Sequence, residues 1–225
     1  MAITRLGGAN AISGVIPTSV GGTGSTASTL PASLINNTSI GNVTALPAGV
    51  AGMDYLGTTT VSSGVSTVDI TLDTTNYGTF KFMLNALQSQ TDGDYLRMRY
   101  STDGGSSFKD GSTDYGYASW EQRNSGSFST NFDNDTTNFP MNHGETAIGS
   151  AGNERTNFEI TLWNNNLYPK VSCIGGGKNA SGNVAQWYRT AVFFTTSTVN
   201  AVRFYLSTGS ATFDGGTIDR YGFTK

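Results

Sequence analysis

The sequence predicts an all-β protein: an antiparallel, jelly-roll-like β-sandwich preceded by an extended N-terminal arm. From about residue 58 onward, apolar and polar residues alternate in short windows, which is the period of a β-strand. Clusters of Gly, Asn, Asp and Ser bound these windows, and no stretch has the apolar spacing of an amphipathic helix. Short strands of this kind, about eight in number, are typical of a jelly roll.

Residues 1–57 form the predicted arm, because their composition differs from that of every later segment. They contain two charged side chains, Arg5 and Asp54, and one aromatic ring, Tyr55. Ordering each residue costs roughly 1–2 kcal/mol of backbone entropy, and small side chains bury too little area to offset that cost. The segment is therefore either a flexible Gly/Ser-rich tail or, in the interpretation we favour, an anchor that orders against a partner. The apolar side chains expected to anchor it to a virion are Ile3, Leu6, Ile12, Val15 and Ile16.

The sandwich itself, 58–225, is predicted from seven alternating windows. The first three each place their apolar residues on one face: Val68, Ile70 and Leu72 in 65–72; Phe80, Phe82 and Leu84 in 78–87; Leu96 and Met98 in 94–101. The fourth window, 157–163, does the same with Phe158, Ile160 and Leu162. Three further windows are interpreted as strands on the same ground: 186–194, 201–206 and 215–223.

A long polar insertion, about 122–155, lies between the strand windows. It contains Phe128, Phe132 and Phe139 among Asn, Asp, Ser and Thr. A loop of this length in a compact domain is usually functional or packed against a neighbour. The sequence therefore predicts a long loop with one of these two roles.

The stretch STDGGSSF, 101–108, resembles the Asp-box of sialidases and other bacterial glycosidases. In that hairpin an Asp accepts hydrogen bonds from turn amides, a Gly takes a positive φ and an aromatic ring packs on the neighbouring strand. Asp103, Gly105 and Phe108 are therefore predicted to hold a turn. A sialidase would also need several copies, a longer propeller, an arginine cluster and a Tyr–Glu pair, so the single copy indicates a structural role.

Residues suited to catalysis or metal binding are sparse. His143 is the only histidine, and Glu145 has no second carboxylate at a spacing suited to acid–base chemistry. Cys173, the only cysteine, is predicted to be a small core residue. The acidic stretches 91–94 and 133–138 do not match an EF-hand, and turn chemistry explains them. The sequence therefore predicts no enzyme, no metal site and no cofactor.

Charge and hydropathy exclude two further classes of partner. The net charge is −3 and the few Lys and Arg are scattered, which argues against nucleic-acid binding. No apolar run is long enough to cross a bilayer, and the first residues lack the pattern of a signal peptide. We therefore expect a soluble protein made in a cytoplasm.

Aromatic rings are the remaining candidates for ligand contact, because a ring on the surface of a β-sandwich can stack on the face of a sugar. Most large aromatic side chains are core or interface residues, since they dominate burial. The candidate glycan-binding residues are Tyr115, Tyr117, Trp120 and Trp187.

The chain resembles the jelly-roll virion proteins of tailed bacteriophages, which include head-fibre, capsid-decoration and tail-fibre proteins. The opening MAITRLGGANAISGVIP is similar to arms that begin virion surface proteins, and TSIGNVTALPAGVAG resembles connectors that lead into a fibre head. YGTFKFMLNALQSQTDGDYLRMRYSTDGGSSF and TFDGGTIDRYGF resemble the first core hairpin and the closing strand of such heads. The resemblance implies a homotrimer with its arm on the virion and its C-terminal head outward.

Three functions follow as hypotheses. The first is a non-enzymatic head fibre or capsid decoration protein, assembled in the host cytoplasm, displayed on the virion surface and bound to capsid or tail proteins. The second is a tail-fibre or receptor-binding protein whose head binds a host-surface glycan. The third, a small glycoside hydrolase, lacks a defensible pair of carboxylates.

Overall fold

The computed structural model describes residues 52–142, 147–164, 167–208 and 210–225. Within them the chain forms twelve β-strands and no helix. The strands are β1 (Asp54–Thr60), β2 (Thr67–Thr71), β3 (Tyr77–Ser89), β4 (Leu96–Ser101), β5 (Tyr115–Arg123), β6 (Phe128–Thr136), β7 (Phe139–Pro140), β8 (Thr156–Trp163), β9 (Lys170–Lys178), β10 (Val184–Phe193), β11 (Ala201–Leu206) and β12 (Phe213–Thr224).

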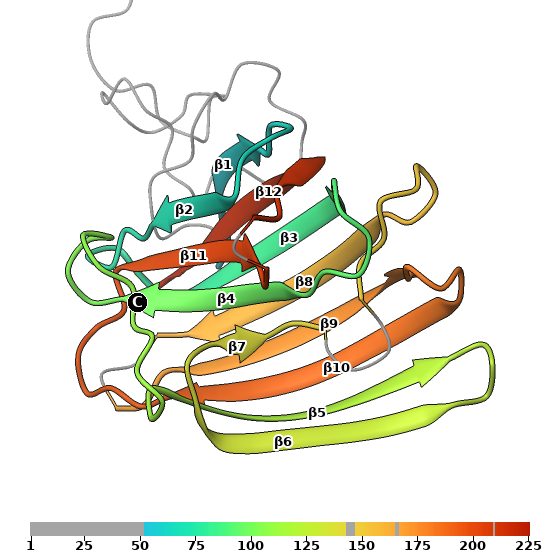
Figure 1. The fold of residues 1–225 in the computed structure, drawn as a ribbon. Coiled ribbons are helices and arrows are strands. Elements are labelled where there is room, and N and C mark those ends of the chain that lie inside the picture. The colour runs from blue at the N-terminus through green and yellow to red at the C-terminus, as the bar shows by residue number, and fades with distance from the viewer. Residues whose placement is uncertain (1–51, 143–146, 165–166, 209) are drawn as a thin grey trace, which may run out of the picture. The chain divides into compact units, whose positions relative to one another are not determined.

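The strands make two sheets that pack face to face as a sandwich (Figure 1). The larger sheet has eight strands in the order β1-β12-β3-β8-β9-β10-β5-β6, and the smaller has four in the order β2-β11-β4-β7. Every pairing among these strands is antiparallel. The predicted all-β, antiparallel sandwich is therefore confirmed.

The core lies between the two sheets and follows from alternation along the strands. Phe82 of β3 and Ile160 of β8 point inward from the larger sheet, while Met98 and Phe204 point inward from the smaller one, and all four are fully buried. The rings of Phe82 and Phe204 meet edge to face with centroids 5.7 Å apart. Burying one such side chain contributes about 1.5–3 kcal/mol, so this core is a major source of the stability of the sandwich.

Each of the seven predicted windows overlaps an observed strand, but the start of the sandwich and the polar insertion differ from expectation. β1 begins at Asp54 and pairs with β12, so residues assigned to the arm lie in the larger sheet. The alternation of apolar residues did not indicate β1, because an edge strand buries little surface and β1 has few apolar residues. Residues 1–51 of the predicted arm, with all its anchoring residues, lie outside the described residues.

Part of the insertion folds as sheet rather than as a loop: it contains the end of β5 and all of β6 and β7. β5 and β6 form a long hairpin that extends the larger sheet beyond β10, and β7 pairs with β4 in the smaller one. Its polar residues reflect an exposed edge rather than irregular backbone, since an edge strand of an antiparallel sheet faces water on at least one side. β9 also escaped prediction, because three consecutive glycines obscure its alternation.

The described residues contain no helix of a length and hydropathy that would let it cross a membrane.

Candidate ligand-binding groove

The turn at 101–108 has the contacts expected of a structural hairpin. The Ser101 hydroxyl and the Ser107 amide donate hydrogen bonds of 2.7 and 2.9 Å to the Asp103 carboxylate, and Gly105 has a φ of 89°. These bonds, the Ser101 hydroxyl first, hold the pKa of Asp103 well below its usual value. The guanidinium of Arg203 on β11 lies over the Phe108 ring, with Cζ 4.1 Å from the ring centroid. Every polar contact of this Asp is therefore spent within the turn.

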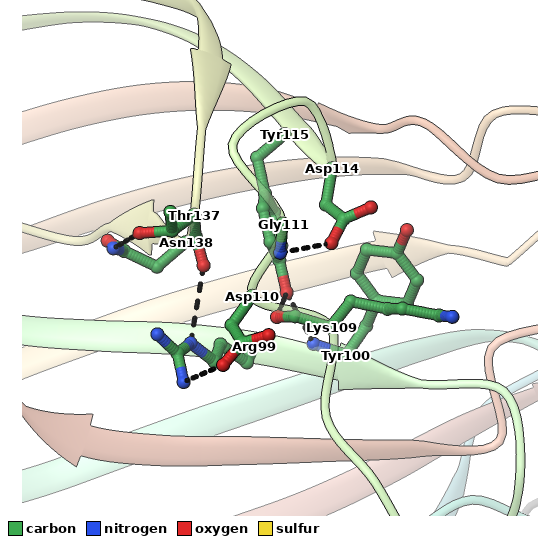
Figure 2. A network of polar contacts seen from close by, with 9 residues as sticks. All are labelled: Arg99, Tyr100, Lys109, Asp110, Gly111, Asp114, Tyr115, Thr137 and Asn138. Carbon is green, nitrogen blue, oxygen red and sulfur yellow. Dashed lines mark hydrogen bonds and ion pairs between the residues drawn. The ribbon is translucent and has the colours of Figure 1, made fainter.

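Tyr115 is not available to a sugar, because its side chain is fully buried at 0% exposure. Its hydroxyl accepts a hydrogen bond from the Tyr100 amide at 3.0 Å and donates one to the Lys109 carbonyl at 2.8 Å, as Figure 2 shows. The ring packs edge to face against Tyr100 and Phe193. Burial raises the pKa of both tyrosines, that of Tyr100 to about 12. The expected ligand contact is instead a core residue that fixes the loop after β4.

The same loop is tied to the end of β6. Arg99 donates from Nε to the Thr137 carbonyl at 3.2 Å and lies 3.6 Å from the Asp110 carboxylate (Figure 2). Asp114 accepts a hydrogen bond of 2.6 Å from the Gly111 amide and closes the turn that leads into β5. These contacts position the start of β5, on which one side of the groove described below depends.

Trp187 is also fully buried, at 0% exposure, so it is corrected from a candidate ligand contact to a core residue. Its ring stacks on that of Phe158 with centroids 5.4 Å apart. Gly175 lies between them in the register, opposite Trp187 on one side and Phe158 on the other. A Cβ at Gly175 would overlap the Phe158 ring, so this glycine makes the stack possible.

Trp120 and Tyr117 are half-buried and face opposite sides of β5. Trp120 points outward and stacks on Tyr188, its direct partner on β10, with centroids 5.3 Å apart and ring planes 6° apart. Phe128 of β6 continues the stack at 6.1 Å. Tyr117 points inward and packs against the core. Of the four candidate rings, Trp120 alone lies on the outer face of the larger sheet.

That outer face carries an aromatic groove with a volume of about 510 Å³, beside the Trp120–Tyr188 stack. Its floor is made of small or slender residues that pair across β5 and β10: Ala118 with Thr190, and Gly116 with Val192. Three rings stand around this floor: Phe132 of β6, Trp163 of β8 and Phe194, which follows β10. Small residues between large rings create the hollow.

The register explains why these residues meet. Phe132 lies directly opposite Ala118, so its ring rises at the edge of the floor. On the other side Lys170 of β9 lies between Val192 and Trp163 in the cross-strand order. Adjacent strands in a sheet are about 4.8 Å apart, so the five strands from β6 to β8 hold the opposing rings a fixed distance apart. The groove is therefore set by sheet geometry and not by loops alone.

Phe194 forms the end wall, and Gly116 lets it do so. A Cβ at Gly116 would lie 2.8 Å from the tip of the Phe194 ring. Tyr168, which has a positive φ of 53°, meets the Phe194 ring edge to face at 6.4 Å, and its amide donates to the Thr195 carbonyl. A strained residue thus supports the position of a groove ring, which is an arrangement found at functional sites.

The groove rings are exposed: Phe132 by 79%, Trp163 by 45% and Phe194 by 40%. A hollow lined mainly by apolar and aromatic side chains with a few polar groups is typical of a small-ligand site. Sequence analysis missed these three residues, although Phe132 was noted within the insertion. A partial signal was present in β5, whose outward positions Gly116 and Ala118 are both small.

Two other chemistry-bearing side chains in the described part of the chain, Cys173 and Arg189, are inaccessible. Cys173 is buried in the core, as predicted, and burial raises the pKa of its thiol to about 12. Arg189 is also buried, and desolvation lowers its pKa to about 10. No group of three or more His, Cys, Asp or Glu among the described residues is placed to hold a metal ion. His143 and Glu145 lie outside the described residues.

Comparison with protein families, with curated proteins and with solved structures gives no match. The function is therefore argued from the sandwich, the groove and the sequence.

Proposed function

We propose that this chain is a non-enzymatic virion surface protein of a tailed bacteriophage, a head fibre or capsid decoration protein. The observation that carries the proposal is the contrast between a sandwich with a complete core and a preceding segment without the residues to build one. The chain divides into two units, 1–51 and 52–225. The second contains the whole described core.

This division supports a separation of tasks. Because the sandwich buries its own core, it does not need the first 51 residues for its cohesion. The near absence of charge in that segment makes its burial against other chains inexpensive, since no charged group has to be desolvated. An arm of this kind suits docking on a capsid or tail component and assembly into a homotrimer, with the sandwich facing outward. The short projecting part favours the head over the tail of the particle.

Labelling of particles tests the location directly. An antibody raised against residues 52–225 should label virus particles purified from the source culture in electron micrographs, on the capsid rather than the tail. Deleting residues 1–20 from the encoded chain should abolish the labelling while the free sandwich stays folded. Normal labelling of particles that carry the truncated chain would contradict the anchoring role.

Solution mass tests the assembly. Light scattering should give a trimer for the full chain and a monomer for a chain that starts at Gly52, two residues before β1. A full chain that is monomeric at all concentrations would contradict trimerisation through the arm.

A second candidate function is a receptor-binding protein with a carbohydrate-binding head. One observation favours it: the exposed aromatic groove on the outer face of the larger sheet. The two functions share the arm and differ in what the head contacts.

A further inference from the structure

The aromatic groove has the shape and lining of a site for sugar rings, and we propose that it binds a glycan built of pyranose units. This assignment deepens the second candidate function and rests on it. Its volume of about 510 Å³ falls within the roughly 300–1,000 Å³ usual for small-ligand sites. It contains both kinds of group that a sugar requires: flat apolar rings and separate hydrogen-bonding side chains.

The rings suit one face of a pyranose. The C–H bonds on that face carry small positive charge, and the face of an aromatic ring carries negative charge, so the two attract when they stack. Phe132 and Trp163 are held on β6 and β8, with the floor residues of β5 and β10 between them. The floor residue Ala118 is small and exposed, so a ligand can approach the sheet closely there, whereas the Phe194 ring covers Gly116.

The polar groups suit hydroxyls. Asn134, Thr190 and Lys170 line the groove, and together they offer amide, hydroxyl and ammonium groups. Lys170 is the only charged side chain in the lining, and no carboxylate faces it there. A neutral or acidic glycan therefore fits the lining, whereas a cationic ligand does not.

A second copy of the chain is a poorer occupant. In a two-fold assembly the same patch contacts itself, so a groove would face a groove; in a trimer the groove would meet a different surface of the neighbouring copy, a case that the oligomeric mass of Phe132→Ala tests below. A stable contact between proteins also requires roughly 800 Å² of complementary surface on each partner. A small-floored hollow ringed by Phe132, Trp163 and Phe194 does not complement its own copy in this way.

The test uses the full chain, fluorescently labelled, on an array of bacterial surface polysaccharides and defined oligosaccharides. The strongest glycan on the array is then titrated by calorimetry and by tryptophan fluorescence. Trp163 lies in the groove, so binding should change the fluorescence, and Trp163→Phe should remove most of that change. A buried structural tryptophan would not respond in this way.

Two phenylalanines on the outer face of β6 provide a matched pair of variants. Phe132 lines the groove and Phe128 lies outside it, with exposures of 79% and 64%. Phe132→Ala should raise the dissociation constant about tenfold or more, the usual cost of losing one stacked ring. Phe128→Ala should change it by less than about twofold, and Ala118→Trp should block binding by filling the floor.

Three results would overturn the proposal. One is the absence of binding to every glycan on the array. Another is undiminished binding by both Phe132→Ala and Ala118→Trp with unchanged melting temperatures. The third is a loss of oligomeric mass in Phe132→Ala without any glycan binding, which would make the groove a contact between copies.

Particle labelling is an independent test. Labelled particles without glycan binding would contradict the glycan proposal alone, and glycan binding without labelled particles would contradict the virion proposal alone.

Discussion

The outer faces of the two sheets differ in how their aromatic rings are used. On the four-stranded sheet each ring is covered by a cation: Arg203 lies over Phe108, Arg99 over Tyr205 and Arg97 over Tyr95. Asp69 completes the arrangement through two hydrogen bonds of 2.7 Å to Arg203. On the eight-stranded sheet the groove rings stand around small residues with open surface between them.

The difference lies in whether the faces of the rings are already covered by another side chain or remain open to contact. A ring under a guanidinium has its attractive face occupied, so it contributes about 0.5–1 kcal/mol to the fold at an exposed site and offers little to a partner. A ring at the edge of a hollow keeps that face free. The same residue type therefore serves stability on one sheet and, in the glycan-binding role proposed above, recognition on the other. The following five experiments test this separation.

The largest loss of stability is expected for a buried residue of the larger sheet, and the losses in the other variants are compared with it. Trp187→Ala removes a fully buried ring stacked on Phe158 and leaves a cavity. We expect a loss of about 3–5 kcal/mol in the free energy of unfolding, measured by urea denaturation. A loss below about 1 kcal/mol would mean that Trp187 is not the core residue described here.

Gly175→Ala tests the same stack from the neighbouring strand. The added methyl group overlaps the Phe158 ring, which must move away from Trp187. Overpacking of this kind costs about 1–3 kcal/mol. Gly152→Ala is the control, since Gly152 has no positive φ and an added Cβ there meets nothing within 4 Å. Equal losses in the two variants would contradict the steric argument.

Replacing Asp103 should change the pH dependence of the stability of the fold, and only in the acidic range. Its pKa is lowered in the folded chain, so the stability that it contributes is present above its unfolded pKa, near 3.8, and is lost as pH falls below that value. The urea concentration at the midpoint of denaturation should therefore fall more steeply with decreasing pH for the wild type than for Asp103→Asn, between about pH 5 and pH 2. Parallel pH profiles for the two proteins would show that the turn carboxylate is not stabilising.

Arg203→Ala tests the outer face of the four-stranded sheet, where guanidinium groups cover the aromatic rings. It removes one ion pair and the cover of the Phe108 ring, both partly exposed. The expected loss is about 1 kcal/mol, reduced by added salt because the pair is screened. Glycan binding should be unaffected, and a loss of binding would place the ligand on the four-stranded sheet instead.

Phe132→Ser should give the smallest change in stability, within about 0.5 kcal/mol, because the ring is 79% exposed and packs on little. The same variant should be less prone to aggregation, measured by light scattering on heating. A loss comparable to that of Trp187→Ala would show that the groove rings hold the fold, and the separation of the two faces would fail.

The fold could be predicted from the sequence where burial imposes alternation. The windows around Phe80, Phe82 and Leu84 or around Phe158, Ile160 and Leu162 became β3 and β8, because these central strands face the core. Prediction missed β5 and β6, whose inward residues include Tyr117 and Asn131 under a sheet edge that is only half covered. Alternation weakens there because the burial that creates it is incomplete.

The site could be predicted only in part, for a geometric reason. In the pair Trp187–Tyr188 the ring chosen from the sequence points inward and its neighbour points outward, and one position of register decides between them. The groove also depends on what is small: Gly116 and Ala118 matter because of the rings that other strands bring beside them. Such a neighbourhood exists only after β5, β6, β8, β9 and β10 have paired.

The β5–β6 hairpin has a consequence for how such a protein can evolve. Its outward positions, among them Ala118, Phe132 and Asn134, lie on the solvent side of the sheet and do not contribute to the core between the sheets. Substitutions there change the surface that another molecule meets and leave the folding free energy nearly untouched. In the glycan-binding role proposed above, successive variants can therefore change from one ligand to another in single steps, without passing through an unstable intermediate sequence.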